Sequence, residues 1–182
     1  MERRTALTLL SAGLLADRID IAKGQLLQIA NAPTEYRLQF FSPATNETVA
    51  ALTETILPAD DHSPGAREAN VSLFIDVMLA NSEATVQQEW VLGIDEFDAE
   101  AHRAFGSTFA QLDAARRHDV MSAAARNEDK PSTELERFFG TLKVMTLNGY
   151  YTSAAGIHRD LQYKGNTALK NYYGCTHPEH QA

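Results

Sequence analysis

The sequence predicts an all-α protein, in which a compact multi-helix domain is followed by an irregular C-terminal tail. Apolar residues recur at helical spacing in successive segments between residues 43 and 146. Capping residues, prolines and short polar stretches separate these segments, as expected for helices joined by loops. The chain has 182 residues, of which 44% are hydrophobic, and this is enough for a single buried core. We therefore expect one domain.

Residues 1–30 have two alternative interpretations. Arg3 and Arg4 precede a mainly apolar stretch at residues 5–16, an arrangement similar to a twin-arginine export signal. The apolar stretch is too short to cross a bilayer as a helix, so no membrane span is predicted. The alternative is an ordinary amphipathic N-terminal helix.

The first helix of the domain is predicted to begin at Ser42 and Pro43. Serine is a favoured N-cap, and proline is favoured at the first helical position. Val49 and Leu52 recur at helical spacing until Pro58 ends the segment.

A polar loop separates this helix from two more. Ser82 is expected to cap the second of these two. Their predicted core residues are Val71, Phe74, Ile75, Met78 and Leu79 in the first, and Val86, Trp90, Ile94, Phe97 and Ala101 in the second.

Two later helices also carry start signals. Asp113 is positioned to cap a short helix, and Thr133 with Glu136 has the spacing of a capping box. Arg116 and Arg117 are expected on an exposed face. The predicted core residues are Val120, Met121 and Ala124 in the short helix, and Leu135, Phe138, Phe139, Leu142, Met145 and Thr146 in the last. Regular spacing weakens after Gly149, so residues 150–182 are predicted to form the irregular tail.

Composition and motifs exclude several classes of function. The net charge of -8 argues against binding to nucleic acid or anionic membranes, which require clustered Lys and Arg. No Gly-x-Gly occurs, so nucleotide-binding glycine loops are missing. Neither Glu-x-x-His nor Gly-x-Ser-x-Gly occurs, which removes di-iron bundle ligands and a common hydrolase motif. We therefore assign no catalytic, cofactor-binding or metal-binding residue.

Two weak metal constellations keep an independent metal-binding helical enzyme open as an alternative. Asp60, Asp61 and His62 are adjacent, but side chains next to one another on a turn rarely converge on one ion, and Asx turns and a helix N-cap explain such residues more simply. Cys175, His177 and His180 resemble half of the ligand set of a structural zinc site. The second pair of ligands that such a site usually needs is missing from the sequence.

Cys175 is the only cysteine of the chain, so it cannot form an intrachain disulfide. In an exported protein such a thiol stays free or pairs with another polypeptide. The alternative is a buried thiol that packs as a small hydrophobe.

The tail is predicted to bind a partner. A structureless run longer than roughly 12–15 residues is usually functional or disordered. Tyrosine offers a large contact area with a polar tip. The candidate interface residues are Tyr172, Tyr173, Cys175, His177 and His180.

Several motifs resemble the gluconate 2-dehydrogenase subunit 3 family, over residues 40–182. They are, in order, LTETILPADD at 52–61, SPGA at 63–66, FID at 74–76, FF at 138–139 with Leu142, GYYTS at 149–153, YKGN at 163–166 and GCTHPEH at 174–180. Their order and spacing make coincidence improbable.

The resemblance implies a non-catalytic small subunit of a membrane-linked or periplasmic dehydrogenase. The large partner in this family is a glucose-methanol-choline (GMC) type flavoprotein that carries FAD, oxidises sugars or sugar acids and often passes electrons to a cytochrome. The small subunit commonly carries a twin-arginine signal and assists export of the folded partner. We therefore expect a hetero-oligomer, FAD only in the partner, and a periplasmic location, with a cytoplasmic one still open. A free-standing helical binding module is the other alternative.

The resemblance also allows a role near the sugar. Tyr150, Tyr151, Tyr163 and Asn166 combine polar and aromatic character, so they are candidates for shaping the partner's substrate entrance. The alternative is that they only pack the interface.

Overall fold

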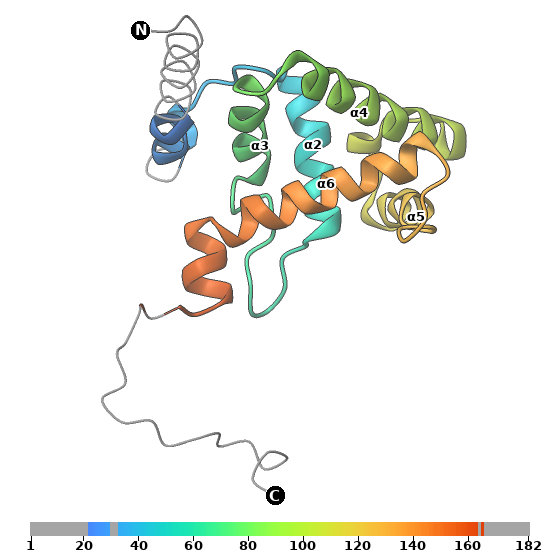
Figure 1. Cartoon of the computed structure of the whole chain (residues 1–182). Helices are drawn as coiled ribbons and strands as arrows, with labels where there is room; N and C mark the ends of the chain where they lie inside the picture. The colour runs from blue at the N-terminus through green and yellow to red at the C-terminus, as the bar shows by residue number, and fades with distance from the viewer. Residues whose placement is uncertain (1–21, 30–32, 164, 166–182) are drawn as a thin grey trace, which may run out of the picture.

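A computed structural model describes residues 22–29, 33–163 and 165, and within them it confirms the all-α prediction (Figure 1). Residues 22–29 are helical. The other elements are η1 (Pro33–Glu35), α2 (Pro43–Ile56), α3 (Val71–Ala80), α4 (Ala84–Phe105), η2 (Phe109–Gln111), α5 (Ala114–Ala124), α6 (Glu134–Tyr151) and η3 (Ala155–Asp160).

Helix α2 occupies the centre of the bundle and contacts α3, α4, α5 and α6 (Figure 1). Its start is as predicted, because Ser42 Oγ accepts the backbone N–H of Thr45 at 3.1 Å. Val49 and Leu52 are fully buried on its inner face. Burial of such a side chain contributes about 1.5–3 kcal/mol.

The predicted cap of α4 is wrong. The Ser82 hydroxyl donates to the carbonyl of Met78 at 2.7 Å, so it completes the end of α3. Glu83 occupies the N-cap position of α4 instead. Val86 was expected in the core but is 37% exposed, because it lies on the first turns of α4, ahead of the buried stripe that starts at Trp90.

The core joins helices α2 to α6. Aromatic rings dominate the contact between α4 and α6, where Trp90 and Phe138 meet edge to face with ring centroids 5.2 Å apart. Phe97 makes a similar contact with Phe109 at 5.8 Å. The predicted core positions Trp90, Ile94, Phe97, Ala101, Val120, Met121, Ala124, Phe138, Phe139, Leu142 and Thr146 are all buried.

Both later helix starts are confirmed. Asp113 accepts the N–H of Arg116 at 2.9 Å, and Thr133 accepts the N–H of Glu136 at 3.2 Å. The Glu136 carboxylate in turn accepts the N–H of Thr133 at 3.1 Å, which completes the capping box.

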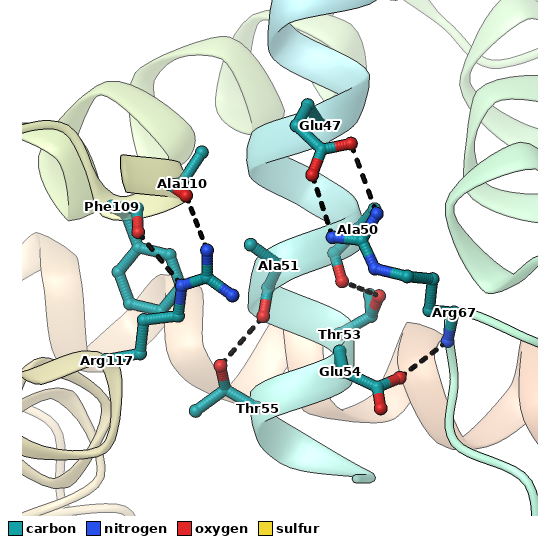
Figure 2. Close-up of polar contacts among 10 residues, drawn as sticks. All are labelled: Glu47, Ala50, Ala51, Thr53, Glu54, Thr55, Arg67, Phe109, Ala110 and Arg117. Carbon is teal, nitrogen blue, oxygen red and sulfur yellow. Dashed lines mark hydrogen bonds and ion pairs between the residues drawn. The ribbon is translucent and has the colours of Figure 1, made fainter. Parts of the chain in front are cut away.

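Arg117 was predicted to be exposed, but it is half-buried. Its guanidinium donates to the carbonyls of Phe109 and Ala110, with Nε 3.2 Å from the Phe109 oxygen (Figure 2). The Phe109 carbonyl also accepts the N–H of Leu112 at 3.2 Å, so Arg117 is a second donor to it and adds a bond to the carbonyl of Ala110. Arg116 is exposed as expected.

Residues 150–160 contradict the predicted start of the irregular tail. Helix α6 continues through Tyr151, and η3 then forms a π-helical turn in which the N–H of Leu161 donates to the carbonyl of Gly156 at 2.9 Å. Ser153 links the two elements, since its hydroxyl donates to the carbonyl of Tyr150 and accepts the N–H of Gly156. These local hydrogen bonds stabilise the segment, which is why it is regular although its sequence shows no apolar stripe.

At the other end of the chain, residues 22–29 lie beside α3 (Figure 1). Ile29 is buried, and Asn81 donates to Gln25 at 3.1 Å. The Arg3-Arg4 pair lies outside the described residues. Within the described part of the chain, no helix is both long and apolar enough to cross a membrane.

Candidate partner interface

A groove of about 580 Å³ lies where the N-terminal segment, the start of α3, the end of α6 and η3 meet. Ile29, Phe74 and Ala155 are among its apolar lining residues. Clefts of this size that are mainly apolar with a few polar groups are typical binding sites. We call it the α6–η3 groove.

The floor of the groove depends on a glycine. A methyl group added at Gly149 would lie 2.8 Å from Cδ1 of Phe74, so any side chain there would displace the ring. The neighbouring wall consists of the small residues Thr152, Ser153 and Ala154. The groove is open because its floor and this wall carry so little side-chain volume.

An ion pair crosses the rim. Arg159 on η3 pairs with Glu68 in the loop before α3, and both side chains are 59% exposed. Exposed pairs of this kind contribute about 0–1 kcal/mol, so little energy is needed to separate them.

Two unusual backbone conformations border the same groove. Asn70 has a φ of 57°, in the left-handed region that few side chains adopt. The π-helical turn of η3 also lines the groove. Both conformations are enriched at functional sites.

Exposed apolar side chains lie close to the groove in the chain. Tyr151 at the end of α6 is 41% exposed, and Leu161 directly after η3 is 58% exposed. Partial burial and the nearby Asp160 carboxylate raise the pKa of Tyr151. A groove with adjacent exposed aromatic and aliphatic residues resembles a protein–protein interface more closely than a small polar active site.

The structure separates the two adjacent tyrosines of the predicted substrate entrance. Tyr151 and Tyr163 are exposed, whereas Tyr150 is completely buried and donates from its hydroxyl to the carbonyl of Pro64 at 2.6 Å. Tyr150 therefore packs in the core. The remaining predicted residues, Asn166, Tyr172, Tyr173, Cys175, His177 and His180, lie outside the described residues.

Asp60 forms the Asx turn that was one of its two predicted structural roles. Its Oδ1 accepts the N–H groups of His62 and Ser63 at 2.8 and 2.7 Å, and these bonds lower its pKa. The N-cap role is wrong, because the next α-helix begins at Val71. Among the described residues, no group of three or more His, Cys, Asp or Glu side chains is arranged to hold a metal ion.

Sequence reasoning missed the carboxylate that organises the N-terminal segment. Asp76 is completely buried in α3 and accepts hydrogen bonds from residues 36–41. Asp76 was noted only as the last residue of the FID motif at 74–76, and neither the motif nor an acidic residue within an apolar helical run identifies its partners.

Sequence reasoning also missed the carboxylate of Glu54, which binds the loop after α2. Glu54 accepts the backbone N–H of Arg67 at 2.7 Å and that of Ala59 at 3.2 Å. The Arg67 guanidinium also forms a two-pronged ion pair with Glu47, as Figure 2 shows. Both ends of the loop are thereby joined to the surface of α2.

Comparison with protein families gives a match over residues 43–167 to the model described as gluconate 2-dehydrogenase subunit 3. The chain belongs to this family. The match begins at the first residue of α2 and extends beyond η3, so it includes most of the α6–η3 groove. It ends before Cys175. A search of curated proteins gave no match, and neither did a search of solved structures.

Proposed function

We propose that this chain is the non-catalytic small subunit of an FAD-dependent dehydrogenase, and that its large partner is a GMC-type flavoprotein oxidising a sugar or sugar acid. The match to gluconate 2-dehydrogenase subunit 3 over residues 43–167 carries the proposal. In the proposed complex, the large subunit holds FAD and a cytochrome accepts the electrons.

Four carboxylates among the described residues bind the backbone of this chain, and this supports a non-catalytic role. The carboxylates of Asp76 and Glu136 are buried, and each accepts several hydrogen bonds from backbone N–H groups. Asp60 and Glu54 likewise bind backbone N–H groups of the loop after α2. These four carboxylates are therefore committed to holding the fold.

We assign the partner surface to the α6–η3 groove and to Tyr151 and Leu161 beside it. Cys175 and the residues around it would extend this surface, and Arg3-Arg4 would direct the assembled complex to the periplasm. Tyr151, Tyr163 and Asn166 remain our candidates for contact near the partner's substrate entrance.

Co-expression tests the proposal. A GMC-type flavoprotein that co-purifies with this chain is produced with and without it, and soluble flavin-containing enzyme and sugar oxidation are measured. We expect this chain alone to bind no flavin and to oxidise no sugar, and its presence to raise the yield of active partner several-fold. A large subunit that is equally soluble and active without this chain would contradict the proposal.

Non-reducing electrophoresis tests the role of Cys175. If it forms an intersubunit disulfide, the purified complex should run as a larger species that disappears with Cys175→Ser. If the wild-type and Cys175→Ser complexes migrate alike, Cys175 forms no intersubunit disulfide and is either a packed side chain or a free thiol.

A further inference from the structure

A buried carboxylate binds the N-terminal part of the chain to the helical bundle through four hydrogen bonds. Asp76 Oδ2 accepts the hydroxyl of Tyr36 at 2.7 Å and the N–H of Gln39 at 2.8 Å. Its Oδ1 accepts the N–H groups of Phe40 and Phe41 at 3.0 and 2.7 Å. All four donors come from the short stretch that leads into α2.

The described residues ahead of α2, namely 22–29 and 33–41, form what we call the N-terminal arm. Only Phe40 and Phe41 of these residues pack on the main core cluster. Farther out, Ile29 is buried and Gln25 accepts a hydrogen bond from Asn81. The helical part of the arm stands at the edge of the bundle beside α3 (Figure 1).

The arm also forms one wall of the α6–η3 groove. Leu26, Ile29 and Pro33 line it from the arm, and Phe74 and Ala155 line it from the bundle. Movement of the arm would therefore change the width of the groove and the exposure of its apolar floor.

We propose that the arm is a hinged clamp over the α6–η3 groove, and that the hydrogen bonds to Asp76 are the latch that keeps it closed. The inference concerns the isolated chain and does not depend on the identity of a partner. Release of the latch leaves the core cluster of α2–α6 in place and uncovers the groove.

The strength and position of the bonds explain why one residue controls the arm. Hydrogen bonds to a charged carboxylate are roughly twice as strong as those between neutral groups. Both the bend at 39–41 and the Tyr36 side chain bind the same carboxylate, so a change in that carboxylate weakens both contacts. Burial and the Asp76 hydrogen bond raise the pKa of Tyr36, which keeps its hydroxyl protonated as a donor.

Hydrogen exchange of the full chain tests the latch. In Asp76→Asn, one carboxylate oxygen becomes an amide that cannot accept, so we expect amides of the arm to exchange about ten-fold faster while α2 and α6 keep their protection. Tyr36→Phe removes one donor and should give a smaller acceleration in the same segment. Asp98→Asn is the matched control, because Asp98 accepts one backbone N–H, that of Phe109. It should not affect the arm.

A thiol probe tests the groove itself. Ala155→Cys combined with Cys175→Ser places the only cysteine of the chain in the groove wall. Adding Asp76→Asn should accelerate its reaction with a bulky maleimide several-fold. Unchanged labelling, unchanged arm exchange, or equal acceleration throughout the chain would overturn the clamp. If Asp76→Asn does not fold, Tyr36→Phe decides by the same criteria.

Discussion

The ring of Phe138 in α6 lies directly against the backbone of Gly93 in α4. A methyl group added at Gly93 would be 2.1 Å from Cγ of Phe138, which is far inside van der Waals contact. Trp90 also packs edge to face on the Phe138 ring, so the ring has little freedom to move away. The two helices can therefore approach this closely only with glycine at position 93.

Gly93→Ala should destabilise the protein. Alanine favours a helix over glycine by about 1 kcal/mol, but overpacking a close aromatic contact costs about 1–3 kcal/mol. We expect the urea midpoint to fall. Gly140→Ala is the control, because it adds the same methyl group within α6 where no atom lies within 4 Å. It should leave stability unchanged or raise it, and similar losses in both variants would contradict the packing argument.

Tyr150 and Tyr151 should separate stability from partner binding. Tyr150→Phe removes the buried hydrogen bond to Pro64 and should reduce the free energy of unfolding by about 1 kcal/mol. Tyr151→Ala removes an exposed side chain whose ring meets that of Tyr150 edge to face at 5.1 Å, so it should cost about 0.5–1.5 kcal/mol.

In the complex, the proposed interface predicts that Tyr151→Ala weakens association with the large subunit, measured by co-purification, and that Tyr150→Phe does not. If both variants co-purify like the wild type, Tyr151 is not part of the interface. Unchanged sugar kinetics in a Tyr151→Ala complex would remove it from the substrate entrance.

The two glutamates beside Arg67 should differ in importance. Glu54→Ala removes an acceptor for the N–H groups of Ala59 and Arg67 and should cost about 1–2 kcal/mol in urea unfolding. Glu47→Ala breaks a pair whose side chains are 56% and 46% exposed, so it should cost less than about 1 kcal/mol. A larger loss for Glu47→Ala would show that the ion pair, and not the backbone contact, holds the loop (Figure 2).

Glu136 should make stability depend on pH in the acid range. The pKa of Glu136 is lowered from 4.5 to about 2. The hydrogen bond from the N–H of Ser132 has the largest effect, and the bond from the Ser132 hydroxyl has the next largest. Because the folded state binds the proton less readily than the unfolded state, the stabilisation is complete above pH 4.5 and is lost as the pH falls toward 2. Urea midpoints of the wild type and Glu136→Gln should therefore converge over this window. A constant difference between them would contradict the assignment.

The helix starts at Ser42, Asp113 and Thr133 could be predicted because each cap binds a backbone group only three residues away. Ser82 shows the limit of this reasoning. Its hydroxyl can bind the carbonyl of the preceding helix, and the sequence does not show which partner is preferred.

The candidate interface could be predicted only in part. A role for Tyr151 near a partner stays a prediction, and the structure adds that its side chain is exposed. Tyr150 is the same type of residue as Tyr151 and is next to it in the chain. It is buried, however, and its hydroxyl binds a carbonyl 86 residues earlier. Asp76 likewise binds groups 35 to 40 residues before it, so neither contact leaves a local pattern.

The central position of α2 affects how the chain can fold during synthesis. α2 leaves the ribosome before the helices that cover it, and its contacts with α5 and α6 require almost the whole family domain. Domains generally fold as units once their sequence is available. Val49 and Leu52 therefore stay uncovered by their final neighbours until α6 has emerged, and the α6–η3 groove is completed only after η3 has followed it.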